Sequence, residues 1–192
     1  AREMRRARVS LGLAGAILPG NYFLDIETAR HLEPVLRAAD DAGALVMIHP
    51  GLMAGEAPPE PYPDTSVLRA SALNLQASLS HMALTLLAGG VPATYRNVTF
   101  QIVNLGGTLP FIVERIDAIA ATRAIDAVAT RDGLRQLVYD SASLGPRALE
   151  LAARVVGADR LMLGSDYPIF PAGAMADTIS GAALSGQDRI QI

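Results

Sequence analysis

The chain has 192 residues, of which 51% are hydrophobic and 18% charged, and its formal net charge is −3 at pH 7. This composition is typical of one globular domain with a substantial core and excludes a disordered chain. The small negative charge, without a run of Lys or Arg, argues against nucleic acid and anionic membranes as partners. The sequence has no cysteine, which excludes disulfides and thiolate chemistry. We therefore expect a cytoplasmic protein.

Short apolar runs alternate with segments of helical periodicity along the whole chain. The expected strands are 11–18, 44–48, 98–103, 137–141 and 161–163. The expected helices are 3–8, 26–41, 67–88, 111–129, 147–156 and 175–184. A loop rich in Pro, Gly and Ala spans 52–63 and is long enough to be an active-site loop.

This alternation predicts parallel strands joined by helical crossovers. It does not separate an open doubly wound sheet from a (β/α)8 barrel. The sequence has no G-x-G-x-x-G after the first strand, no G-x-x-x-x-G-K-[ST] and no G-x-S-x-G. Nucleotide-binding folds and α/β-hydrolases are therefore weaker alternatives.

A polar residue lies at or near the carboxyl end of each expected strand. Because parallel strands end at the same edge of a sheet, we expect these residues to converge. They are Asn21, His49, Asn104, Asp140 and Asp166. Barrel enzymes place catalytic groups at such strand exits, although an Asp there can also simply cap a turn.

An imidazole and a carboxylate at neighbouring strand exits can bind Zn²⁺ or another divalent ion. Such an ion would activate water or polarise a carbonyl, while a carboxylate moves protons. A catalytic zinc usually takes three protein ligands. The other histidines, His31 and His81, lie in expected helices. His31 is expected at the surface, and His81 either at the surface or with its hydrogen bonds satisfied inside the fold, so neither is expected to supply the third ligand.

Three blocks of sequence resemble successive blocks of the amidohydrolase-2 (amidohydrolase-related) family, in its order and spacing. They are Met47-Ile-His-Pro-Gly51, Asn104-Leu-Gly-Gly-Thr-Leu-Pro-Phe111 with Glu114-Arg115, and Leu163-Gly-Ser-Asp-Tyr-Pro168. The family includes aminocarboxymuconate-semialdehyde decarboxylase and related aromatic-acid decarboxylases and hydrolases. The resemblance covers nearly the whole chain, and G-S-D-Y-P is its most specific part.

The resemblance implies a TIM (β/α)8 barrel of the metal-dependent hydrolase type. Residues 1–192 would form one partial barrel domain that covers about strands 4 to 8. His49 matches the family's strand-5 metal ligand. Asp166 matches the strand-8 carboxylate, which binds or faces the metal and handles protons. Arg115 matches an arginine that serves substrate carboxylates or the dimer contact.

Two departures from the family pattern concern the site. The family's H-x-H on strand 1 is absent, and since both ends of the sequence look cut, we expect those ligands upstream. Asn104 stands where the family has a proton-transferring histidine. An asparagine amide can orient a water but cannot accept a proton near neutral pH.

We expect an enzyme that decarboxylates or hydrolyses a small aromatic or unsaturated carboxylic acid, and the sequence alone does not choose between the two reactions. His49 and Asp166 would hold the metal, most simply Zn²⁺, with Asp166 and Asn104 as the catalytic residues. Asn21, Tyr22 and Arg115 would contact the substrate. We expect the protein to form a homodimer. One alternative is a non-catalytic barrel remnant that serves as a binding module. Another is a metal-independent hydrolase on the same fold.

The strand count yields a prediction about association. A barrel of this type needs eight strands, and a sheet of about five cannot close into one. The outer strands at 11–18 and 161–163 would therefore keep unpaired backbone groups beside an apolar face. We expect residues 1–192 alone to associate or aggregate when measured by light scattering. A monodisperse monomer that unfolds cooperatively would contradict the strand count.

Overall fold

The computed structural model describes residues 1–59, 67–123 and 131–192. These form two compact units, 1–100 and 101–192, and each is treated by itself below. The single domain expected over 1–192 therefore stays a prediction. The end of the expected loop 52–63 and the end of the expected helix 111–129 lie outside the described residues.

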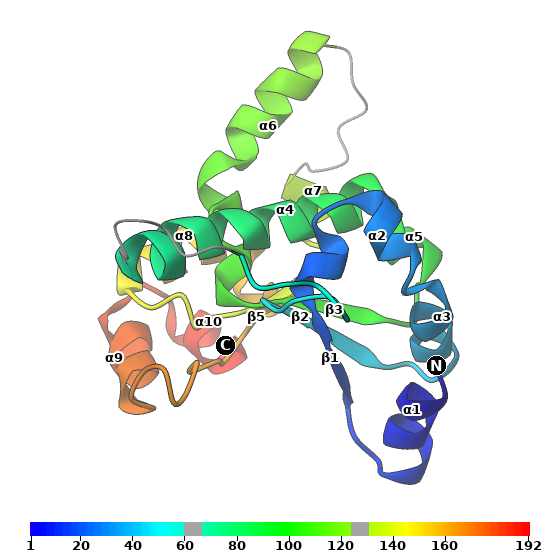
Figure 1. Cartoon of the computed structure of the whole chain (residues 1–192). Coiled ribbons are helices and arrows are strands. Elements are labelled where there is room, and N and C mark those ends of the chain that lie inside the picture. The colour runs from blue at the N-terminus through cyan, green and yellow to red at the C-terminus, as the bar shows by residue number, and fades with distance from the viewer. Residues whose placement is uncertain (60–66, 124–130) are drawn as a thin grey trace. The chain divides into compact units, whose positions relative to one another are not determined.

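Parallel strands and helices alternate in the described part of the chain, as the sequence predicted (Figure 1). The strands are β1 (Gly15–Pro19), β2 (Leu45–His49), β3 (Thr99–Ile102), β4 (Val138–Asp140) and β5 (Leu161–Met162). The α-helices are α1 (Arg2–Arg5), α2 (Ile26–Arg30), α3 (Glu33–Asp41), α4 (Leu75–Ala88), α5 (Val91–Thr94), α6 (Leu109–Arg123), α7 (Arg131–Leu134), α8 (Pro146–Val156), α9 (Gly173–Gly181) and α10 (Gly186–Gln191). The strand order is β1-β2-β3-β4-β5.

In the first unit, β1 and β2 pair in parallel, with Gly15 opposite Leu45 and Pro19 opposite His49. Gly15 is required by this pairing, because a Cβ there would overlap the backbone of Leu45. The Thr99 N–H, at the start of β3, donates to the Ala44 carbonyl at 3.1 Å. This register places His49 at the carboxyl end of β2.

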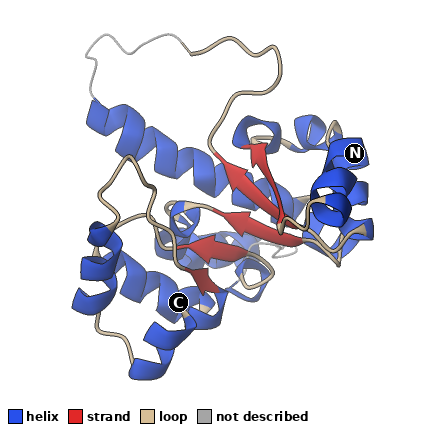
Figure 2. Ribbon diagram, turned by 90° about the horizontal axis from the view of Figure 1, so that it is seen from below, coloured by secondary structure: helices blue, strands red, loops and turns tan. Residues whose placement is uncertain are grey.

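In the second unit, β4 pairs in parallel with both β3 and β5 (Figure 2, strands in red). Tyr139 lies opposite both Ile102 and Leu161. The three strands are short and apolar, and Phe100, Ile102 and Leu161 are buried. Asp140 is the last residue of β4, and the loops that follow β3 and β5 carry Asn104 and Asp166.

The expected extent of two elements was wrong. The first strand begins at Gly15, not at residue 11, and Leu11 and Leu13 are exposed. The single helix expected over 26–41 is two helices, because the chain leaves helical geometry at Leu32 (φ −89°, ψ 0°). Pro34 then occupies the first turn of α3, where its missing N–H costs no hydrogen bond.

Helical spacing predicts that five apolar residues of the expected helix 67–88 face inward: Leu68, Leu75, Leu79, Met82 and Leu86. The Leu68 side chain is instead 78% exposed. Residues 69–74 form a π-helical segment before α4, and this wider turn shifts the periodicity that the prediction assumed to be regular. Leu79, Met82 and Leu86 are buried as expected. Gly90, with φ of +61°, follows the end of α4.

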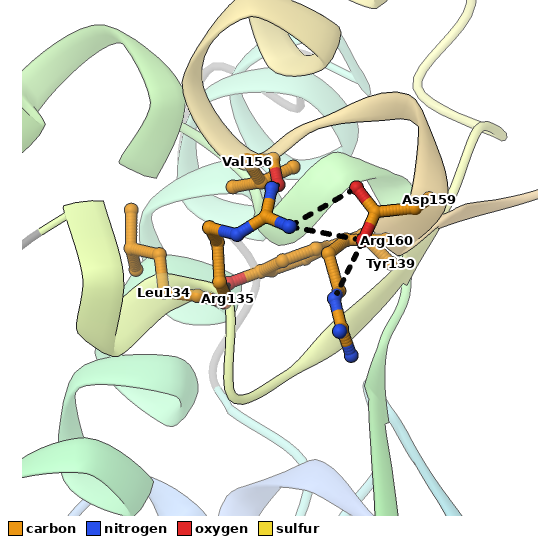
Figure 3. A network of polar contacts seen from close by, with 6 residues as sticks. All are labelled: Leu134, Arg135, Tyr139, Val156, Asp159 and Arg160. Atoms are coloured by element: carbon orange, nitrogen blue, oxygen red, sulfur yellow. Dashed lines mark hydrogen bonds and ion pairs between the residues drawn. The ribbon is translucent and has the colours of Figure 1, made fainter. Parts of the chain in front are cut away.

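An arginine network supports the starts of β4 and β5 (Figure 3). Arg135 Nη1 donates to the Val156 carbonyl at the end of α8, and Nη2 donates to Asp159 Oδ2 at 2.9 Å. Arg160 Nε forms an ion pair with the same oxygen at 3.3 Å. A guanidinium suits this place because it meets both a helix-terminal carbonyl and a carboxylate.

Tyr139 belongs to the same region, and its hydroxyl donates to the Leu134 carbonyl at 2.8 Å (Figure 3). Burial raises the pKa of this hydroxyl, so it remains a hydrogen-bond donor at physiological pH. Because these contacts lie where the strands begin, they stabilise the fold rather than form the site at the strand exits.

Gly157 gives a test of this region. It has φ +91° and ψ 145°, a conformation essentially restricted to glycine. We expect Gly157→Ala to lower the free energy of unfolding by about 1–3 kcal/mol in urea titrations. Gly173→Ala is the control, because a Cβ there meets nothing within 4 Å and its φ is not positive. Equal free energies of unfolding for the two variants would show that the conformation at position 157 does not require glycine.

Candidate active site

His49 is the last residue of β2 and its side chain is exposed. Nδ1 lies 3.0 Å from the Pro50 carbonyl oxygen. A carbonyl only accepts hydrogen bonds, so this contact favours a proton on Nδ1 and leaves the Nε2 lone pair free. Metal-binding histidines are commonly oriented in this way by a backbone carbonyl.

Glu56 organises the loop after β2, and sequence reasoning missed it. Its carboxylate accepts from Asn21 Nδ2 at 2.9 and 3.0 Å and from the Met53 N–H at 2.7 Å. The Asn21 N–H donates to the Gly51 carbonyl at 3.0 Å. The only signal in the sequence was a carboxylate within the expected active-site loop.

Tyr22 makes a second contact with this loop, because its Oη accepts the Ala54 N–H at 3.2 Å. Asn21 and Tyr22, both expected to bind substrate, therefore hold the segment 51–56 against the turn that follows β1. The Tyr22 hydroxyl keeps its own proton for donation. Their contact with substrate remains a prediction.

Asp140 is the centre of the second unit's strand exits. It is 6% exposed. Oδ1 accepts the Asn104 N–H at 2.8 Å and the Ala142 N–H at 3.1 Å, and Oδ2 accepts from Gln101 Nε2 at 3.1 Å. One buried carboxylate thus joins Gln101 of β3 and Asn104, two residues after that strand, to the exit of β4.

Opposing influences act on the pKa of the Asp140 carboxyl. Burial raises this pKa, whereas the hydrogen bonds from the Asn104 and Ala142 N–H groups and from Gln101 lower it. The charge of Asp166 raises it further. The net direction of the pKa is upward, and burial is its main cause.

Asn104 begins a left-handed turn. Four consecutive residues have positive φ: Asn104 (+53°), Leu105 (+57°), Gly106 (+73°) and Gly107 (+70°). The Gly107 N–H donates to the Asn104 carbonyl at 3.0 Å. Gly106 also lies against Tyr139, where a Cβ would come 2.7 Å from Cε1. The glycine pair is therefore needed for both conformation and space.

Left-handed backbone is unfavourable for Asn104 and still more for Leu105, and such strain is concentrated at functional sites. Asn104 is buried. The surrounding structure must hold this geometry, and the hydrogen bond to Asp140 is the contact that holds the Asn104 N–H.

Asp166 is half-buried and has φ of +53°. Its carbonyl accepts the Ile169 N–H at 2.8 Å, which turns the chain after β5. Before it, the Gly164 N–H donates to the buried Ser141 Oγ at 3.2 Å. A Cβ on Gly164 would lie 2.7 Å from the Cβ of Asp140, so the backbone leading to Asp166 passes directly against Asp140.

The remaining predicted residues are on the surface. Arg115 lies in α6 and is exposed, as is Phe111 one turn earlier, at 81%. His31 and His81 are exposed, as expected. His49 belongs to the first unit and Asn104 and Asp166 to the second, so their expected convergence stays a prediction.

Within residues 1–59, 67–123 and 131–192, no three His, Cys, Asp or Glu side chains are grouped to hold a metal ion. His49 nevertheless offers a free Nε2, and Asp166 offers a carboxylate, which are donors that suit a divalent ion. None of the described helices has both the length and the apolar character needed to cross a membrane.

A family model described as Amidohydrolase matches residues 1–192. The chain belongs to the amidohydrolase family. The resemblance carried by the three sequence blocks is thereby confirmed.

This amidohydrolase is similar to several decarboxylases. It is 25% identical over 179 residues to 2-amino-3-carboxymuconate-6-semialdehyde decarboxylase of Dictyostelium discoideum, covering 91% of this chain and 48% of that protein. The structure of 5-carboxyvanillate decarboxylase from Sphingomonas paucimobilis matches all of this chain over 59% of its own, with a TM-score of 0.75 and 20% identity. Dihydroxybenzoic acid decarboxylase from Polaromonas sp. JS666, with bound manganese and the inhibitor 2-nitroresorcinol, matches at 0.74 and 19%, covering 100% of this chain and 61% of that one.

These structures show the fold. They are TIM-barrel amidohydrolases, which confirms the expected (β/α)8 class and the assignment of this chain to part of such a barrel. The chain spans about half the length of the curated relative and about three fifths of the solved chains.

The role of Glu56 in the amidohydrolase can be tested by hydrogen exchange. We expect Glu56→Ala to speed exchange of the Met53 amide by about 10-fold or more, because a bond to a charged acceptor contributes roughly 1.5–3 kcal/mol. Glu27→Ala is the control, since Glu27 is exposed and pairs with Arg30 on the helix surface. Unchanged exchange at Met53 would show that the loop is held by other contacts.

Proposed function

We propose that this amidohydrolase is a metal-dependent enzyme that decarboxylates a small aromatic or unsaturated carboxylic acid. The observation that carries the proposal is the family match, together with decarboxylases among its relatives. Hydrolysis of a similar acid is the alternative reaction.

His49, through Nε2, and Asp166, through its carboxylate, would contribute ligands to a divalent ion, as their match to the family motifs implies. The hydrogen bond from His49 Nδ1 to Pro50 supports this role, because it aims the free nitrogen away from the backbone. We expected Zn²⁺, and the manganese in the Polaromonas enzyme makes Mn²⁺ an equal candidate. When bound, such an ion polarises oxygens of the substrate.

Asp166 would hold and transfer the proton, since a carboxylate can act as a general acid or base. Asn104 would orient the substrate or a water through its amide, without taking up a proton. Its backbone is held in a strained turn by Asp140, which supports a role that requires a fixed position.

Arg115 would pair with a substrate carboxylate or take part in a contact between two copies. The exposed Phe111 and Arg115 on α6 support a homodimer contact, because an exposed aromatic residue beside an arginine is typical of interfaces. Asn21 and Tyr22 would line the substrate site next to the loop that they hold. We also propose a cytoplasmic location.

Asn104 favours a second candidate function, a non-catalytic barrel that binds a small acid. A third, a metal-independent hydrolase, would use His49 and Asp166 to activate water directly. Turnover that survives chelation would identify the hydrolase, whereas binding of an aromatic acid without turnover would identify the binding module.

The main test measures bound metal and turnover of a panel of aromatic acids in the whole protein. We expect Asp166→Asn to lower turnover by at least roughly 100-fold, the low end for a general acid–base group, with little change in stability. Asp177→Asn makes the same charge change on the exposed surface of α9 and should leave turnover unchanged. Retained turnover in Asp166→Asn would make Asp166 a turn residue only.

A further inference from the structure

Asp140 has no role in the proposed chemistry, although it is a buried carboxylate at the strand exits. We propose that Asp140 is a positioning residue whose carboxylate holds the left-handed turn at Asn104 and supports the backbone that leads to Asp166. This inference rests on the proposed function for its effect on turnover, but its structural part stands independently.

The first argument is the hydrogen bond to the turn itself. Asp140 Oδ1 accepts the N–H of Asn104, the first of four residues with positive φ, at 2.8 Å. Asn104 is buried, so loss of this acceptor would leave its N–H without compensation. The turn would then relax toward a less strained conformation and move the Asn104 side chain.

The second argument is the number of donors that meet on Asp140. Ala142 N–H shares Oδ1, and Gln101 Nε2 reaches Oδ2 at 3.1 Å. The three donors are Gln101 in β3, the Asn104 N–H two residues after β3, and the Ala142 N–H in the loop after β4. A carboxylate that connects them fixes the spacing of two strand exits.

The third argument is the close approach of Gly164. Its Cα lies so near Asp140 that an added Cβ would come 2.7 Å from the Asp140 Cβ and 3.0 Å from its Cγ. The Asp140 side chain therefore forms the surface against which the chain turns toward Asp166, two residues later. Asp140→Ala keeps the Cβ of this surface but removes the Cγ and Oδ1 atoms that lie next to it.

These contacts distinguish positioning from direct chemistry. An asparagine at 140 keeps Oδ1 for both backbone N–H groups, and its amide can donate to Gln101 Oε1 once the Gln101 amide rotates. Asparagine cannot take part in proton transfer as a carboxylate can. Asp140→Asn should therefore preserve a positioning role, while Asp140→Ala removes every one of these hydrogen bonds.

The experiment uses the whole protein and compares Asp140→Ala, Asp140→Asn and the wild type. Turnover of the aromatic acids is measured as kcat and KM, and the Asn104 amide is followed by NMR. Gln101→Met is the matched control, because it removes only the bond to Oδ2 and leaves the Asn104 N–H on Oδ1.

We expect Asp140→Ala to lower kcat by about 10- to 100-fold, the usual effect of removing an outer-shell support. Its Asn104 amide resonance should move upfield and lose protection from exchange. Asp140→Asn should lose less than about 10-fold in kcat, with a smaller upfield shift because its acceptor is neutral. Gln101→Met should leave the Asn104 amide in place.

Two results would overturn the inference: an Asn104 amide that is unaffected by both substitutions at 140, or a loss of kcat in Asp140→Asn as large as in Asp140→Ala. If Asp140→Ala does not fold, Asp140→Asn alone tests the inference. An unshifted Asn104 amide in Asp140→Asn, or a loss of kcat above about 10-fold, would then overturn it. If the wild type turns over none of the acids, the proposed function fails, while the NMR comparison continues to test the positioning role.

Discussion

The strand exits of the second unit depend on one buried carboxylate. The Asp140 carboxylate is buried and accepts hydrogen bonds from Gln101, Asn104 and Ala142. A buried charge is costly unless its oxygens are satisfied, and here both are. The same residue leaves room only for glycine at position 164. The conformations of the residues around Asn104 and Asp166 follow from this arrangement.

The first unit uses a comparable device on a loop. Glu56 accepts from a side chain and from a backbone N–H, and Tyr22 accepts another N–H of the same loop. Both units thus satisfy irregular backbone after a strand with side-chain oxygens, since backbone groups outside regular structure need such partners. His49 lies between these contacts in sequence, with its Nδ1 directed to the Pro50 carbonyl.

Stabilising contacts and the candidate site lie at opposite ends of the strands in the second unit. The Arg135, Asp159 and Arg160 network and the Tyr139 hydroxyl lie where β4 and β5 begin, whereas the strained turns and Asp140 lie where the strands end. Barrels of this class place chemistry at the carboxyl ends and stabilising contacts at the other ends. The proposed enzyme follows that division.

The sequence by itself determined the α/β class, the family and the placement of His49, Asn104 and Asp166 at or shortly after the carboxyl ends of strands. Apolar runs that end at Pro or Gly are local signals, so strand exits can be located without knowing what packs there. Tertiary structure alone decided the contacts between Asp140 and Asn104, 36 residues apart, and between Asn21 and Glu56, 35 apart. The split of 26–41 at Leu32, by contrast, has a local signal in Pro34, which lacks the N–H that a helix interior needs. Periodicity reports only which face of a local element is apolar, whereas the two long-range contacts arise from partners that the chain brings together when it folds.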